Sequence, residues 1–169
     1  MNTLVLTVVG HDRASLVADV AEVVAAHGGN WEDSSLAELA GAFAGIIQVS
    51  VPAGRAQELR EALRELNGLI AVSVPAFGGG GARDGERVSF DVLGNDRPGI
   101  VKELGATLAS LGVSVERMTT QTRDAAMTGG RLFAATVLAT LPADRTIDEV
   151  VAGLERLATE IQVDVTVTE

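Results

Sequence analysis

A short polar turn, Asn95–Gly99, holds the residues of this 169-residue chain whose types and order could do chemistry: Asn-Asp-Arg-Pro-Gly. It lies between an apolar run typical of a strand and aliphatic residues at helical spacing. Where a turn leads into a helix, unpaired backbone N–H groups and the helix dipole favour an anion. The Asp96 carboxylate is a good helix N-cap and could also hold an ammonium group. Helix capping alone and the binding of a small charged ligand are therefore both open.

The other residues of the turn have roles of their own. Pro98 suits a first helical turn, because the N–H that it lacks would be unpaired there. Gly99 has no Cβ, so another backbone or a ligand can approach closely. Arg97 and Asn95 together are also the pair that the anion-cradling loop of an acylphosphatase-like enzyme needs. Such an enzyme is therefore an alternative to a binding site.

The whole pattern occurs twice in the chain. The segment Gly10–Val17 aligns with Gly94–Val101 at an offset of 84 positions, which persists past the next helix. Pro52 then pairs with Pro142 at an offset of 90, so the second copy carries six extra residues, expected around 124–130. An internal duplication of this kind predicts two domains with one fold.

The first copy differs from the second at the turn. Ala14-Ser15 stand where the second copy has Pro-Gly, so the first copy is assigned more by the repeat than by its own motif. The residues that correspond to Asn95, Asp96 and Ser114 of the second copy are His11, Asp12 and Asn30. If a ligand binds, the second copy is therefore the better candidate to hold it.

Each copy has the element order strand, helix, strand, strand, helix, strand. Strands are predicted over 3–9, 30–38, 43–51 and 69–76, and again over 87–93, 114–122, 131–141 and 161–168. This is the βαββαβ order of an α+β ferredoxin-like domain, an antiparallel sheet with both helices on one face. The four consecutive glycines at 78–81 favour a flexible linker. The predicted organisation is a domain at 1–77, a linker at 78–85 and a domain at 86–169.

Composition restricts the function. The net charge of −10 and the small number of aromatic residues, four Phe and one Trp, disfavour direct binding of nucleic acid. The chain has no Cys, which excludes a thiolate metal site and a cysteine nucleophile. No Ser-His-Asp set and no metal-ligand spacing is recognisable. No apolar run reaches the roughly 18 residues of a membrane span, and no signal peptide is evident, so a cytoplasmic protein is expected.

The turn Gly94–Val101, together with Leu111–Val115 at the entry to the following strand, resembles the ACT domain, a small amino-acid-sensing module. The resemblance covers essentially the whole chain, twice, and tandem ACT chains of this length are similar to the glycine cleavage system transcriptional repressor group. It implies that Asp96 and Ser114 contact an amino acid. The implied site comprises Asn95, Asp96, Arg97, Pro98, Gly99 and Ser114, joined at the junction by His11, Asp12 and Asn30 of the opposing copy.

The resemblance also implies a function. We expect a non-catalytic regulatory protein that binds a small amino acid, needs no cofactor or metal, and forms a homodimer. Its acidic charge implies that any control of transcription passes through a protein partner such as a transcription factor and not through DNA. The alternatives are the acylphosphatase-like enzyme and an assembly module that binds no ligand.

Overall fold

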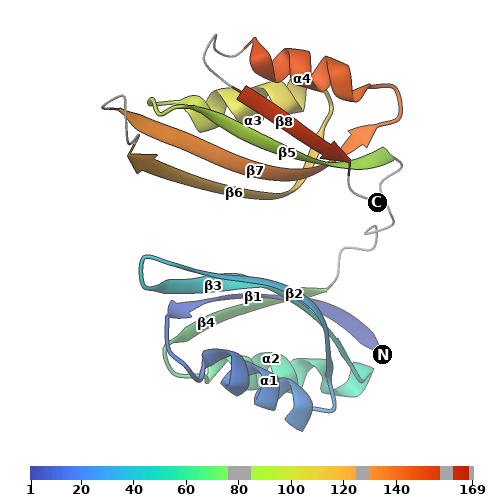
Figure 1. The fold of residues 1–169 in the computed structure, drawn as a ribbon. Coiled ribbons are helices and arrows are strands. Elements are labelled where there is room, and N and C mark those ends of the chain that lie inside the picture. The colour runs from blue at the N-terminus through green and yellow to red at the C-terminus, as the bar shows by residue number, and fades with distance from the viewer. Residues whose placement is uncertain (76–84, 125–129, 157–161, 168–169) are drawn as a thin grey trace. The chain divides into compact units, whose positions relative to one another are not determined.

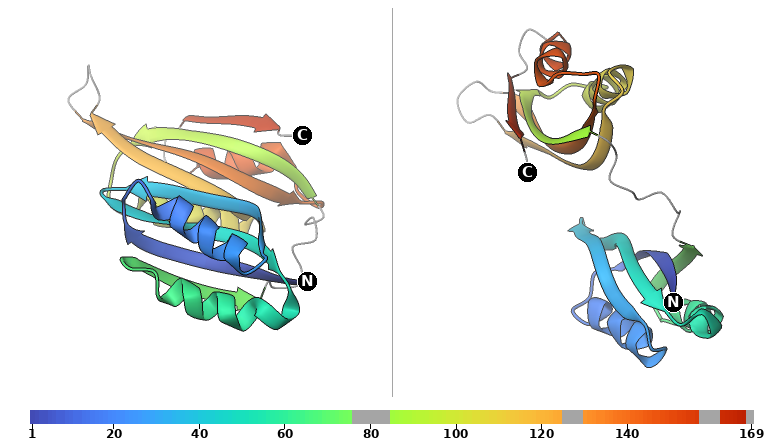
Figure 2. Two further views of the ribbon diagram at one scale, coloured as in Figure 1. Left: turned by 90° about the horizontal axis from the view of Figure 1, so that it is seen from below. Right: turned by 90° about the vertical axis from the view of Figure 1, so that its right-hand side faces the viewer.

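The computed structural model describes residues 1–75, 85–124, 130–156 and 162–167. The chain divides into two compact units, Met1–Gly80 and Gly81–Glu169. In each unit a four-stranded antiparallel sheet carries two helices on one face, as Figures 1 and 2 show. This confirms the predicted tandem of βαββαβ modules.

The elements of the two units correspond one to one. The first unit contains β1 (Asn2–His11), α1 (Leu16–Ala26), β2 (Asn30–Leu39), β3 (Ala42–Val51), a 3₁₀ turn (Ala53–Arg55), α2 (Ala56–Arg64) and β4 (Leu69–Pro75). The second contains β5 (Gly85–Asn95), α3 (Ile100–Ser110), β6 (Ser114–Asp124), β7 (Arg131–Pro142), α4 (Ile147–Glu155) and β8 (Gln162–Val167). The strand orders are β2-β3-β1-β4 and β6-β7-β5-β8, so the strand before each polar turn is central.

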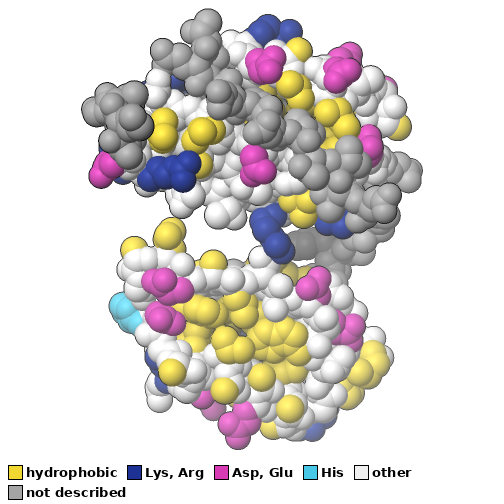
Figure 3. Space-filling model, viewed as in Figure 1, with side chains coloured by type: hydrophobic (Ala, Val, Ile, Leu, Met, Phe, Trp, Pro, Cys, Tyr) yellow, Lys and Arg dark blue, Asp and Glu magenta, His cyan; other side chains and the backbone are white. Residues whose placement is uncertain are grey.

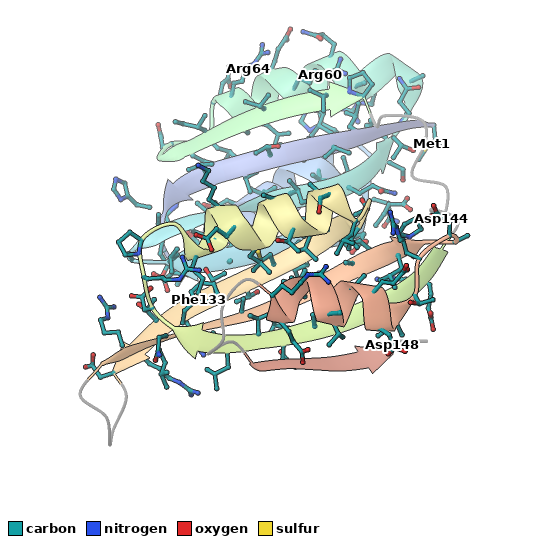
Figure 4. The ribbon with its side chains drawn as sticks, turned by 90° about the horizontal axis from the view of Figure 1, so that it is seen from above. Met1, Arg60, Arg64, Phe133, Asp144 and Asp148 are labelled. Carbon is teal, nitrogen blue, oxygen red and sulfur yellow. The ribbon has the colours of Figure 1, made fainter. Side chains whose placement is uncertain are left out.

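Each unit has its own hydrophobic core between sheet and helices. Alternate residues of β1, Leu4, Leu6 and Val8, point to the helices, as a strand with one covered face requires. In the second unit Phe90 is fully buried on β5, and Phe133 of β7 lies in the same core (Figure 4). Apolar residues at period 2 on strands and at helical spacing on helices therefore meet in one layer per unit.

The boundary of the linker differs from the prediction. Gly85 is the first residue of β5 and pairs with Pro142. The prediction places this residue in the linker and begins the second domain at residue 86. A Cβ at Gly85 would lie 1.9 Å from the carbonyl oxygen of Leu141, so the close strand pairing explains this glycine. The rest of the predicted linker, 78–84, lies outside the described residues.

The six extra residues of the second copy lie where the repeat places them. Leu39 pairs with Ala42 across a two-residue hairpin, and the corresponding pair is Arg123 with Leu132. Asp124 and Arg131 add one further pair to the ladder of β6 and β7. Residues 125–129 of this insertion lie outside the described residues.

The hairpin of the first unit places an alanine in a left-handed conformation. Ala40 has φ 53° and Gly41 has φ 81°, the two positive values of a type I′ turn. A left-handed conformation costs an L-residue with a Cβ roughly 1–2 kcal/mol, and Asn tolerates it better than Ala.

We expect Ala40→Asn to raise the free energy of unfolding by about 1 kcal/mol, because Asn-Gly is the preferred pair for this turn. Urea unfolding followed by circular dichroism measures the change. The matched control is Ala14→Asn, since Ala14 is an exposed turn residue without positive φ. An equal gain in both variants would contradict the assignment of strain to Ala40.

Candidate ligand site

The polar turn of each unit is held against the hairpin of the same sheet. The backbone N–H of Asp96 donates to the carbonyl of Arg131 over 2.8 Å, and the N–H of Asp12 donates to that of Gly41 over 3.0 Å. The two turns are thus anchored alike, each at the end of its central strand. Their frames correspond even though their sequences differ.

Between anchor and helix the two turns have different backbones. In both, the fourth residue donates its N–H to the carbonyl of the first: Ile100 to Arg97 and Leu16 to Arg13. Gly99 has φ 89° and ψ −2°, the third position of a type II turn, in which Pro is favoured at the second. Ser15 has φ −91° and ψ −9°, the same position of a type I turn. The peptide group between Pro98 and Gly99 therefore points in the opposite direction from the one between Ala14 and Ser15.

The helix caps differ from the prediction. The N-cap residues are Gly99 and Ser15, not Asp96 and Asp12, and neither α1 nor α3 has a side-chain cap. Three residues separate each aspartate from the first residue of the helix that follows it. Each aspartate therefore lies too far before the helix to cap its N-terminus. Pro98 accordingly precedes the N-cap and does not occupy the first helical turn.

The arginine of each turn pairs with an acidic residue of the helix that follows. Arg97 donates two hydrogen bonds to Glu103, over 2.7 and 2.5 Å, and Arg13 lies 2.7 Å from Asp19. Hydrogen bonding between Arg97 and Glu103 raises the pKa of the guanidinium and lowers the pKa of the carboxyl group. Each pair spans six positions, and the repeat offset relates the two pairs. Sequence reasoning missed both acids, although this equivalence pointed to them.

Each sheet separates the residues predicted to share a ligand. The turn at Asp96 follows the end of β5, whereas Ser114 begins β6 and pairs with Thr140, which also faces Arg87 near the start of β5. Arg87 and Asn95 on this strand are roughly 26 Å apart at about 3.3 Å per residue. Asn30 likewise lies at the opposite end of its sheet from His11 and Asp12. Within one unit, Asp96 and Ser114 cannot contact the same small ligand.

The structure offers little to nucleic acid. Phe90 and Phe133 are buried and Phe43 packs against the core of the first unit, so none of the three forms an exposed stacking platform. Arg60 and Arg64 lie along α2 (Figure 4), a helix that also carries acidic residues, and Arg55 pairs with Glu58. On the side shown in Figure 3, basic and acidic side chains are interspersed.

The described part of the chain contains neither a cluster of metal ligands nor a helix that could span a membrane. No group of three or more His, Asp or Glu residues there could hold a metal ion. No helix among these residues is long and apolar enough to cross a membrane.

Comparison with known proteins identifies the module. Residues 2–74 match the ACT domain family. The first unit is an ACT domain. The second unit has the same order of elements and the same strand order, so the chain is a tandem of ACT-like modules. A search of curated proteins finds no match.

Two solved structures share the fold over nearly the whole chain. An unknown protein from Galdieria sulphuraria is 27% identical, with a TM-score of 0.87 over 99% of both chains. A "putative glycine cleavage system transcriptional repressor" is 17% identical, with a TM-score of 0.70 over 99% of this chain and 98% of that one. The fold of the whole chain, with both modules, therefore recurs in two solved structures.

We expect Gly99→Ala to lower the free energy of unfolding by about 1–2 kcal/mol, because Ala would carry the left-handed φ of the type II turn. Ser15→Ala is the matched control and should change it by less than about 0.5 kcal/mol, since Ser15 is exposed and has negative φ. Chemical unfolding of both variants measures the difference. Similar losses in the two would show that turn type does not distinguish the units.

Proposed function

We propose that this protein is a non-catalytic regulator that binds a small amino acid through its ACT modules and acts through a protein partner. Support comes from the ACT family of the first unit and the full-length tandem fold. The type II turn of the second unit is the single observation that carries the choice of site.

The orientation of one peptide group favours the second unit. Type I and type II turns differ by a rotation of roughly 180° about the central peptide, so the N–H of Gly99 points opposite to that of Ser15. An added Cβ at Gly99 would meet no atom within 4 Å, so the space beside this N–H is open to a ligand. The α-carboxylate would accept from this N–H and the Asp96 carboxylate would hold the ammonium group.

The other half of the site would come from a second ACT module. Ser114 lies at the end of its sheet opposite to the turn at Asp96–Gly99. A ligand at this turn could therefore contact Ser114, or its counterpart Asn30, only if that residue belongs to another module. We expect Asn30 of another module to take part there, with the protein acting as a homodimer. His11 and Asp12 lie at the opposite end of that sheet, so they would not reach the same ligand as Asn30. Asn95, Pro98 and Arg97 shape the turn, Arg97 through its bond to Glu103.

The pairing of Arg97 with Glu103 weakens the acylphosphatase-like alternative. An anion-cradling loop needs a guanidinium turned to the substrate, whereas this one donates two hydrogen bonds to a carboxylate of its own helix. No described observation favours that enzyme over the regulator.

The proposed regulation passes through protein contacts. The net charge of −10 opposes binding to a phosphate backbone, so a transcription factor is the partner that fits a role in gene control. This chain shares its fold with a protein described as a glycine cleavage system transcriptional repressor. That similarity suggests glycine as the first amino acid to test and the cytoplasm as the site of action.

A thermal-shift screen of the twenty common amino acids tests the proposal. We expect one small amino acid to stabilise the full chain, by about 2.7 kcal/mol at a hundred times its Kd. If none does, the chain is an assembly module and the proposal is wrong.

Variants then locate the site by calorimetry. Asp96→Ala should weaken binding by about 1.5–3 kcal/mol, the range for a hydrogen bond to a charged group. Its unfolding midpoint should stay unchanged, because Asp96 caps no helix. Asp12→Ala is the matched variant at the other turn. Loss of binding in Asp12→Ala with full binding in Asp96→Ala would move the site to the first unit.

A further inference from the structure

The sheet of the first unit has an apolar face that its helices do not cover. The strand register places Thr7 and Val9 of β1, Ile46 of β3, Ile70 and Val72 of β4, and Leu39 of β2 on this side. We call these six residues the open face. Its five large hydrophobic members are between 43% and 79% exposed.

On this side of the first unit, ionisable side chains among the described residues occur only at the margins of the sheet. Asp33 occupies the β2 edge beside Gln48, and His11 the end of β1 beside Ala42. The interior positions of β1, β3 and β4 between them carry aliphatic side chains, a threonine and a glutamine. A contiguous, exposed and nearly uncharged sheet face marks an interaction site in a protein whose surface is otherwise acidic.

The second unit has polar residues at five of the six corresponding positions, and Leu93 stands for Val9. Asp91 stands for Thr7, Thr136 for Ile46 and Arg123 for Leu39. Asp91 accepts a hydrogen bond from Thr136 over 2.7 Å. The two copies keep equivalent cores, but their uncovered faces have diverged in opposite directions.

An ion pair strengthens the polar character of this face. Arg87 of β5 lies 2.8 Å from Glu116 of β6, and Thr140 of the intervening β7 also donates to Glu116. The polar groups of the second unit thus bind one another across three strands and remain suited to water. The first unit has Thr3 where the second has Arg87, and it cannot form this pair.

We infer that the open face of the first unit packs against the same face of a second copy of this chain. The contact would be sheet on sheet, about 10 Å between layers, around a two-fold axis. A partner with a charged face fits poorly: covering Asp91, Arg117 and Arg123 with aliphatic side chains would remove water without supplying partners. An identical apolar face carries no such cost.

The size of the face agrees with a weak to ordinary dimer. Four strands spaced about 4.8 Å apart and about 25 Å long give roughly 500 Å² per copy, or roughly 1,000 Å² for the pair. Specific interfaces start at roughly this total. Dimerisation should therefore be visible at micromolar concentration, and one unpaired charge at the centre of the face should abolish it.

Sedimentation velocity on the full chain tests the inference. We expect a dimer for the natural sequence, and at least about a hundredfold increase in dimer Kd for Ile46→Lys, which would bury two unpaired ammonium groups. Thr136→Lys, at the equivalent position of the second unit, should leave Kd unchanged. A monomeric natural chain, a dimeric Ile46→Lys chain, or equal weakening by both variants would each overturn the inference.

Cross-linking gives a readout that does not depend on the affinity. Because the chain has no cysteine, Thr7→Cys introduces one thiol at the centre of the open face, and Asp91→Cys introduces its equivalent in the second unit. Mild oxidation or a short bis-maleimide should join two chains of Thr7→Cys and leave Asp91→Cys uncross-linked. The reverse pattern would place the contact on the second unit. None of these readouts requires amino-acid binding, so the ligand screen and the tests of the contact can fail separately. A monomeric chain would also contradict the homodimer of the proposed function, whereas a dimer that Ile46→Lys leaves intact would overturn this inference alone.

Discussion

Two helices can cover only one face of a four-stranded sheet. The side chains on the other, uncovered face are the main difference between the two units of this protein. In both units the covered face packs against the helices through aliphatic residues at equivalent positions of the central strand and the helices. The uncovered faces follow two different solutions, hydrogen-bonded polar side chains in one unit and exposed aliphatic side chains in the other. Duplication has thus preserved the fold while the chemistry of the two uncovered faces has become different.

The same separation occurs at the polar turns. Both are anchored through the aspartate N–H to the neighbouring hairpin, and both carry an arginine paired with an acid on the next helix. Only the central peptide differs, because Gly99 permits a positive φ that Ser15 does not adopt. One backbone rotation decides which groups face outward, so two turns with nearly the same frame offer different hydrogen bonds to a ligand.

Much of this fold follows from local patterns in the sequence. Apolar runs located the eight strands and helical spacings the four α-helices, and the offset change from 84 to 90 placed the insertion in one hairpin. The helix starts were mispredicted because Asp-Arg-Pro-Gly fits both a cap and a complete turn before the helix. The hydrogen bond from Ile100 to Arg97 and the positive φ of Gly99 distinguish the two.

The assembly of the site was harder to foresee. Strands joined through a helix in a βαββαβ unit run parallel, so Ser114 had to start at the end of the sheet away from Asp96, and topology alone could have shown it. The opposite character of the open faces was also present in the sequence. It became visible only once the register had assigned each residue to a side.

The most direct test of the central claim, that the type II turn of the second unit is the amino-acid site, is an NMR titration. Amide resonances of the labelled chain would be followed during addition of each candidate amino acid, with the two turns compared in one spectrum. The account predicts saturable shifts of the Gly99 and Ile100 amides, with those of Ser15 and Leu16 nearly constant. Shifts confined to Ser15 and Leu16, or none in either turn, would contradict it.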